Sequence, residues 1–91
     1  MQIKKVTILN KSGLHARPAA DFVGAAGKFK SRISIRRVGA EGEEVNAKSI
    51  VMLLSLALAQ GEEAELIAKG DDEEAAVEQL SALITEGFGE L

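Results

Sequence analysis

Apolar and polar residues alternate in several short segments of the chain, a pattern typical of half-buried β-strands. Four strands are predicted on this basis, near residues 5–8, 32–36, 43–45 and 63–68. In the fourth, Ala64, Leu66 and Ala68 would face one side of a sheet and the residues between them the other. A glycine-bounded turn at residues 39–42 would join the second strand to the third as a hairpin.

Other segments carry apolar residues at the spacing of an amphipathic α-helix. Three helices are predicted, at residues 16–26, at 49–56 and from the segment 70–74 to a point before Gly87. Their apolar faces include Ala19, Phe22, Val23 and Ala26 in the first helix and Val77, Leu80, Leu83 and Ile84 in the third. Gly27 would end the first helix, and the acidic residues 71–74 would stabilise the start of the third.

The predicted elements follow one another as β-α-β-β-α-β-α. One-sided strands combined with amphipathic helices favour the α+β class. The expected architecture is an open-faced β-sandwich, in which three helices cover one face of a four-stranded, mainly antiparallel sheet. At 91 residues the chain is long enough for one small core, and we expect residues 1–91 to form a single domain.

Composition and charge exclude several classes of function. The chain has no cysteine, which excludes disulfides, thiolate metal sites and thiol nucleophiles. A formal net charge of −3 argues against nucleic acid as the main partner, because phosphate backbones require a basic surface. The first residues do not form a secretory signal, and the near-apolar run 50–59 is about half the length that a bilayer requires. These features predict a cytoplasmic protein without membrane insertion.

The only histidine, His15, lies between a glycine-containing turn and the predicted start of the first helix. Pro18 suits the first helical turn, so His15 falls at or near the N-cap, where free N–H groups and the helix dipole favour an anion. Arg17 adds a positive charge with donors suited to phosphate oxygens, and Ser12 adds a hydroxyl. A neutral imidazole is nucleophilic, and phosphoryl transfer needs little beyond positioning and charge stabilisation. These residues predict a phosphoryl carrier, not an enzyme acting alone.

A plainer interpretation is that His15 only caps the helix and that Arg17 is a solvated surface charge. The combination of a turn, a histidine, an arginine and a proline at one helix start weighs against it. A metal site is not expected, because the positions three and four residues from His15 hold no histidine or carboxylate. A Ser-His-Asp triad finds no support, since the chain has no nucleophile elbow. No cofactor is expected.

The segment GLHARPA, residues 13–19, resembles the active-site signature of the HPr family, the histidine-containing phosphocarriers of the phosphoenolpyruvate-dependent sugar phosphotransferase system. The similarity extends over nearly the whole chain. It implies the open-faced sandwich, delivery of the phosphoryl group by phospho-enzyme I to Nδ1 of His15, and its receipt by IIA proteins or domains. Ser12, Ala16 and Arg17 are implied as the residues that bind the phosphoryl group. A monomer is expected for a carrier with transient partners.

The segment VNAKSI, residues 45–50, resembles the regulatory site of HPr proteins that an ATP-dependent HPr kinase/phosphorylase modifies. The resemblance implies phosphorylation of Ser49, with a transcriptional regulator as a further partner. A serine at a helix start accepts a phosphate without unfolding the helix, because the dipole favours the negative charge. Asn46 and Ser49 are also ordinary N-cap residues, so a cap without regulation is the alternative.

The second predicted helix carries the expected contact surface for partner proteins. Resemblance to the family implies partner contacts by Arg17, Ile50, Val51 and Leu54. Leu53 and Leu56 would face inward, and the alternative is that all the apolar residues of this helix belong to the core. A phosphate on Ser49 would place a dianion at the edge of this surface and weaken docking to an acidic enzyme I.

Ala57 departs from the family pattern, which usually has glycine at this position close to the active centre. If the backbone there requires a positive φ, alanine is strained; otherwise the loop has adjusted. The departure concerns the fine geometry of the site and not the identity of its residues.

Two other functions remain open. The chain would use the same chemistry in a regulatory, non-sugar branch, either nitrogen-linked or serving a dihydroxyacetone kinase, with different acceptors. Alternatively, it would be a regulatory protein-binding module that acts through phospho-Ser49. Family members of that kind lack the active histidine, so His15 counts against this alternative. A purely structural domain with a fortuitous motif would not share similarity over the whole chain.

Overall fold

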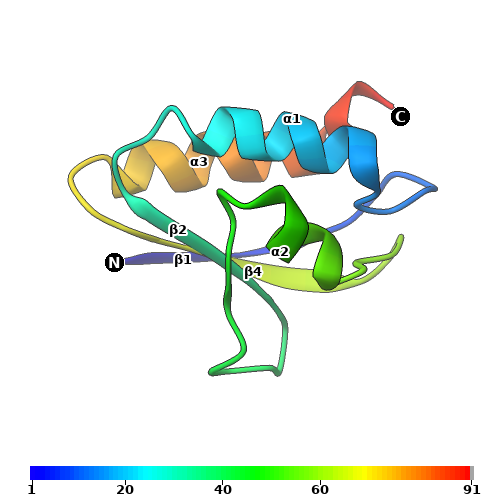
Figure 1. Ribbon diagram of the computed structural model, residues 1–91, viewed down its shortest axis with the longest axis horizontal. Coiled ribbons are helices and arrows are strands. Elements are labelled where there is room, and N and C mark those ends of the chain that lie inside the picture. Colours follow the sequence, from blue (N-terminus) through cyan, green and yellow to red (C-terminus); the bar gives the residue numbers. More distant parts are fainter. Residues whose placement is uncertain (91) are drawn as a thin grey trace.

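The computed structural model describes residues 1–90. Its elements are β1 (Gln2–Thr7), α1 (Ala16–Ala26), β2 (Arg32–Arg37), β3 (Val45–Asn46), α2 (Ile50–Ser55), β4 (Glu63–Lys69), α3 (Glu73–Thr85) and the 3₁₀ helix η1 (Gly87–Gly89). The predicted order of strands and α-helices is confirmed (Figure 1). Only η1 was not expected. Within the described residues, no helix is both long and apolar enough to span a membrane.

The four strands form one sheet in the order β1-β4-β2-β3, and every neighbouring pair is antiparallel. The three α-helices lie on one side of this sheet (Figure 1). Helix α1 contacts both α2 and α3, so the helices form a continuous layer. The predicted open-faced sandwich is therefore confirmed.

The core fills the space between the sheet and the helices, as the alternation of apolar residues predicted. Ala64, Leu66 and Ala68 of β4 are buried, whereas the side chains between them face the open side of the sheet. The helical residues buried against them include Ala19, Phe22, Ala26, Val77, Leu80 and Ile84. Val23 and Leu83, predicted on the same faces, are only partly buried.

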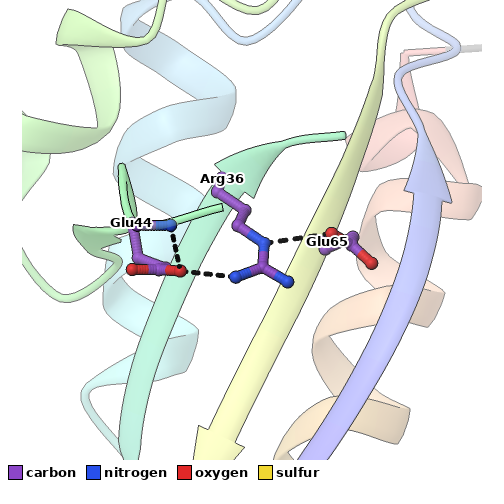
Figure 2. A network of polar contacts seen from close by, with 4 residues as sticks. Arg36, Glu44 and Glu65 are labelled. Atoms are coloured by element: carbon purple, nitrogen blue, oxygen red, sulfur yellow. Dashed lines mark hydrogen bonds and ion pairs between the residues drawn. The ribbon is translucent and has the colours of Figure 1, made fainter. Parts of the chain in front are cut away.

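The third strand is shorter and begins later than predicted. Residues 43–45 were expected in the strand, but β3 comprises only Val45–Asn46. The carboxylate of Glu44 accepts the N–H of Gly42 at 3.1 Å and binds Arg36, which also donates to Glu65 at 3.0 Å on the open face of the sheet (Figure 2). These contacts keep Glu44 in the hairpin turn, and the Gly42 N–H and Arg36 lower the pKa of its carboxyl.

The acidic run before α3 has a second role that the sequence pattern did not indicate. Glu73 and Glu74 lie in the first turn of α3, as expected for stabilising carboxylates. Asp72, however, accepts the backbone N–H groups of Lys30 and Ser31 at 2.8 and 2.9 Å, and also the Ser31 hydroxyl. The Ser31 hydroxyl and the Lys30 N–H lower the pKa of Asp72 to about 2. Asp72 thus ties the start of α3 to the connection before β2.

Candidate functional site

His15 is the N-cap residue of α1, the position predicted from the sequence. Its backbone is extended, with φ −83° and ψ −170°, and its carbonyl oxygen accepts the N–H of Ala19 at 2.9 Å. The imidazole makes no capping hydrogen bond to the helix. With 41% of its side chain exposed, the ring is accessible to a reacting group while its backbone is held by the helix.

A tight turn before the helix determines where His15 lies. The N–H of Gly13 donates to the carbonyl oxygen of Asn10, and Nδ2 of Asn10 donates to the carbonyl oxygen of Gly13 at 2.6 Å. Gly13 has φ 67°, and a Cβ at this position would lie 2.5 Å from the carbonyl oxygen of Leu58. Only glycine combines this backbone conformation with so close a contact. The next residue, Leu14, is buried, and its N–H donates a hydrogen bond to the carbonyl oxygen of Leu58.

The start of α1 provides donors for an anion beside the ring. The N–H groups of Ala16 and Arg17 have no acceptor within the helix, and Pro18 has no N–H to offer. A phosphoryl group on the imidazole would lie at the positive end of the helix dipole, within reach of such amides. Arg17 makes no ion pair with any of residues 1–90, so its guanidinium is available to bind phosphate oxygens.

A shallow cleft of about 650 Å³ gathers most of the predicted phosphate-binding side chains around the ring. It is lined by Leu9, Lys11, Ser12, His15, Arg17, Gln60 and Glu90. Lys11 adds a second positive charge and directly precedes the predicted Ser12 in the sequence. The structure therefore brings Ser12, His15 and Arg17 together on one surface.

Glu90 and Asn10 contact the site, and the sequence pattern indicated neither. Oε2 of Glu90 lies 3.6 Å from Nε2 of His15, and Oε1 accepts a hydrogen bond of 3.0 Å from Nδ2 of Asn10. Asn10 could have been suspected, because it begins the turn before the motif. Glu90 could not, since it is separated from the motif by nearly the whole chain.

Ala57 lies in the connection between α2 and β4 and adopts φ 50°. The backbone there has the positive φ for which alanine is strained, the first of the two alternatives considered above. The carbonyl oxygen of Leu58, the next residue, accepts a hydrogen bond from the N–H of Leu14. The strained segment therefore packs directly against the turn that presents His15.

Helix α2 exposes the residues predicted to contact partners. Ile50, Val51 and Leu54 are exposed, Val51 by 72%, and Met52, which was not predicted, is exposed beside them. We call Ile50, Val51, Met52 and Leu54 the α2 surface. Leu53 is fully buried and Leu56 packs against the core, so both face inward as expected.

Ser49 is the N-cap of α2. Its hydroxyl oxygen accepts the N–H of Met52 at 3.3 Å, the geometry of an ordinary serine cap. Asn46, the other candidate cap, instead accepts the N–H of Lys48 at 2.9 Å. Of the two candidate caps, Ser49 is therefore the one that caps α2.

The arrangement supports nucleophilic chemistry. Among residues 1–90, no group of three or more His, Cys, Asp or Glu side chains is placed to hold a metal ion. The cleft contains His15, whose neutral ring is a nucleophile, and the cations Lys11 and Arg17. Such a site can accept a phosphoryl group and stabilise its charge.

Comparison with known proteins agrees with this chemistry. The family model described as "PTS HPr component phosphorylation site" matches residues 3–86. The phosphocarrier protein HPr of Treponema pallidum is 42% identical over 90 residues, which cover 99% of both chains. The HPr-like protein Crh of Bacillus subtilis is 47% identical over 83 residues, 91% of this chain and 94% of Crh. A multiphosphoryl transfer protein of Haemophilus influenzae is 40% identical over 84 residues, 92% of this chain, but the chain spans only 17% of that protein.

Solved structures give the same result. HPr from Thermoanaerobacter tengcongensis superposes with a TM-score of 0.92 at 47% identity, covering 100% of this chain and 99% of that one. A structure of an HPr dimer from the same organism superposes with a TM-score of 0.75 at 48% identity, covering 99% of this chain and 100% of that one. The match of a phosphorylation-site model across most of the chain, around an exposed histidine at a helix N-terminus, shows that this protein belongs to the HPr family of phosphotransferase-system phosphocarriers.

Proposed function

We propose that the protein accepts a phosphoryl group from phospho-enzyme I on His15 and passes it to IIA proteins or domains in sugar uptake. The observation that carries the proposal is the position of His15, exposed at the N-cap of α1 in one cleft with Ser12 and Arg17. The amides of Ala16 and Arg17 and the Arg17 guanidinium would bind the phosphoryl oxygens. The Ser12 hydroxyl, on the turn before the helix, would supply a further donor.

The transfer itself requires only a nucleophile and charge stabilisation. A ring nitrogen of His15 attacks phosphorus while the bond from phosphorus to the donor breaks, and the helix start holds the negative charge in place. The chain is modified in each cycle and then restored by the acceptor. It is a carrier, and both catalytic partners would be larger proteins that dock on its surface.

The docking surface in this proposal is the α2 surface together with Arg17. Exposed apolar side chains and arginine are both common at the centre of protein interfaces. Enzyme I and the IIA acceptors would bind it in turn, because the phosphoryl group must move from one to the other through the same histidine. We expect the carrier to act as a monomer, since each docking event uses the same surface. Measurement of its mass in solution by light scattering checks this.

Ser49 is the proposed regulatory site, modified by an HPr kinase/phosphorylase and read by a transcriptional regulator. The residue begins α2, so a phosphate on its hydroxyl would adjoin the exposed Ile50 and Val51. The added charge would oppose docking of an acidic enzyme I. A Ser49→Asp variant should therefore accept phosphate from enzyme I more slowly than the wild type, whereas Ser49→Ala should not. Equal rates for Ser49→Asp and the wild type would exclude this mode of regulation.

A regulatory binding module is the second candidate function, and the similarity to Crh is the observation that favours it. A binding module would need Ser49 and not His15, whereas the carrier needs His15. A carrier in a non-sugar branch would differ from one in sugar uptake only in the protein that accepts the phosphoryl group. A single transfer assay separates these functions: the chain is loaded with labelled phosphate by enzyme I and phosphoenolpyruvate, purified, and mixed with isolated IIA domains. Discharge to a sugar-specific IIA domain supports the sugar system, discharge only to a regulatory IIA domain supports the other branch, and failure to load supports the binding module.

A further inference from the structure

The imidazole of His15 has a carboxylate, that of Glu90, beside it in the same cleft as Ser12 and Arg17. Oε2 of Glu90 lies 3.6 Å from Nε2 of His15. This separation is a few tenths of an ångström longer than a hydrogen bond, and contacts of this kind in unliganded sites shorten when the reacting groups are in place. Of the ring nitrogens, Nε2 is therefore the one beside the carboxylate.

Glu90 is held in place by contacts at both its backbone and its side chain. Its N–H donates to the carbonyl oxygen of Gly87 at 2.9 Å, which closes the turn of η1. Phe88, in the middle of that turn, packs against the core and has φ 56°. The backbone of Glu90 is thus anchored near His15 by packing.

Asn10 determines which carboxylate oxygen of Glu90 faces the ring. Only 1% of Asn10 is exposed, and its Nδ2 donates to both the Gly13 carbonyl oxygen and Oε1 of Glu90. Both partners are acceptors, so the amide can satisfy them only with its nitrogen turned towards them. With Oε1 bound to Asn10, Oε2 is the oxygen that remains for His15.

We propose that Glu90 is a positioning residue for His15: its carboxylate accepts a hydrogen bond from Nε2–H and leaves the lone pair of Nδ1 as the nucleophile. This inference rests on the proposed carrier function and identifies the residue that selects the reactive nitrogen. The physical reason is the fixed relation between the two ring nitrogens, since a neutral imidazole that donates from one is an acceptor at the other.

The same carboxylate balances the charge that forms during transfer. When the Nδ1 lone pair bonds to phosphorus, the bond from phosphorus to the donor breaks and its electrons leave with the donor. The proton on Nε2 stays on the ring, which becomes a positively charged phosphoimidazolium. Glu90 stabilises that cation, as an aspartate does for the imidazolium of a serine protease. Onward transfer reverses these steps, with the acceptor's nucleophile forming the new bond to phosphorus.

The test measures the proton position directly. The ¹⁵N chemical shifts of the His15 ring report which nitrogen carries the proton in the neutral form, and they require no partner protein. We expect the Nε2–H tautomer to predominate in the wild type. In Glu90→Ala the ratio of the Nε2–H tautomer to the Nδ1–H tautomer should fall by about tenfold. This is the effect of losing one hydrogen bond to a charged group. Glu90→Gln keeps an acceptor but loses the charge, so its tautomer ratio should lie between those of the wild type and Glu90→Ala.

A transfer assay completes the test. The rate of phosphorylation by enzyme I should fall in the same order, from wild type to Glu90→Gln to Glu90→Ala. Glu86→Ala is the matched control, because Glu86 does not line the cleft, and it should leave both measurements unchanged. A tautomer ratio that is the same in the wild type and Glu90→Ala would overturn the proposal, as would an altered ratio with unaltered rates. If enzyme I fails to phosphorylate even the wild type, the carrier function is wrong, and the tautomer ratios still decide the role of Glu90.

Discussion

Nη2 of Arg37 lies 2.8 Å from the carbonyl oxygen of Leu56 and donates a hydrogen bond to it at the end of α2. The same guanidinium binds the carboxylate of Glu62, which also accepts the N–H of Ala59 at 2.8 Å. The connection between α2 and β4 is therefore held on both sides of Ala57. These contacts keep Ala57 in the left-handed conformation, although alanine itself disfavours it.

Replacement of Ala57 by glycine should stabilise the protein. Glycine adopts φ 50° without the steric cost that alanine bears, so the free energy of unfolding should rise by up to about 1 kcal/mol. Thermal unfolding measured by circular dichroism should then show a midpoint higher by several degrees. Ala20→Gly, on the exposed face of α1, is the control and should lower stability by about 1 kcal/mol. Equal destabilisation by both substitutions would show that Ala57 is not strained.

Replacement of Gly13 by alanine should destabilise the protein and displace the turn before His15. The new Cβ would lie 2.5 Å from the Leu58 carbonyl oxygen and 2.9 Å from Cα of Ala59, at a residue with φ 67°. We expect a loss of about 2–4 kcal/mol, measured by urea unfolding. Gly24→Ala is the matched control: the position is helical, nothing lies within 4 Å of its Cβ, and stability should rise by about 0.5–1 kcal/mol. The same sign for both variants would contradict this account.

Asp72 should make a pH-dependent contribution to stability. Its pKa is lowered from 3.8 to about 2 by the Ser31 hydroxyl and the Lys30 N–H, so the folded state favours the ionised form. The contribution is fully present above the unfolded pKa of 3.8 and is lost as the pH falls towards 2. Asp72→Asn should therefore be less stable than the wild type at pH 6, with the difference shrinking steadily below pH 4.

Unfolding free energies of both proteins between pH 6 and pH 2 check this. Asp71→Asn, which changes the exposed neighbouring carboxylate, should not reproduce the trend. The carboxyls of Glu44, Glu62 and Glu73 also have lowered pKa values, so all the proteins lose stability in acid, and only the difference between them reports on Asp72. A difference that stays constant with pH would contradict the contribution of the ionised carboxylate.

The α2 surface should be needed for phosphoryl transfer but not for folding. Val51 is 72% exposed, so Val51→Asp removes an apolar contact and adds a negative charge without disturbing the core. We expect its KM as a substrate of enzyme I to rise by about tenfold or more, the effect of losing a central interface residue. Val38→Asp is the control, because Val38 is 40% exposed in the hairpin after β2 and not on α2. If the two variants behave alike, α2 is not the docking surface.

The sequence allowed the sheet, the helices and the position of His15 to be predicted because local signals determine them. Alternating residues placed Ala64, Leu66 and Ala68 in the core, and a proline in the first turn located the N-cap. The resemblance to the HPr family added the possibility of strain at Ala57, which depends on one backbone angle, the φ of 50° at that residue. In each case the residues concerned are close together in the chain.

Features that depend on distant residues were not predictable. Glu90 meets His15 only because η1 returns the chain to the site, and Asp72, just before α3, binds Ser31 in the connection before β2. The start of β3 was misplaced because Glu44 bonds to Gly42 and Arg36 in preference to joining the strand. No spacing rule in a single sequence reports such contacts, since they arise from the packed arrangement of the whole fold.

If His15 accepts a phosphoryl group, the mass of the intact protein must increase when enzyme I and a phosphoryl source are supplied. The purified protein is incubated with phosphoenolpyruvate and a catalytic amount of enzyme I, and its mass is recorded before and after mild acid. We expect the gain of one phosphoryl group that acid removes and that a His15→Ala variant never acquires. No gain in the presence of an enzyme I that phosphorylates a known HPr, or an equal gain by His15→Ala, would contradict it.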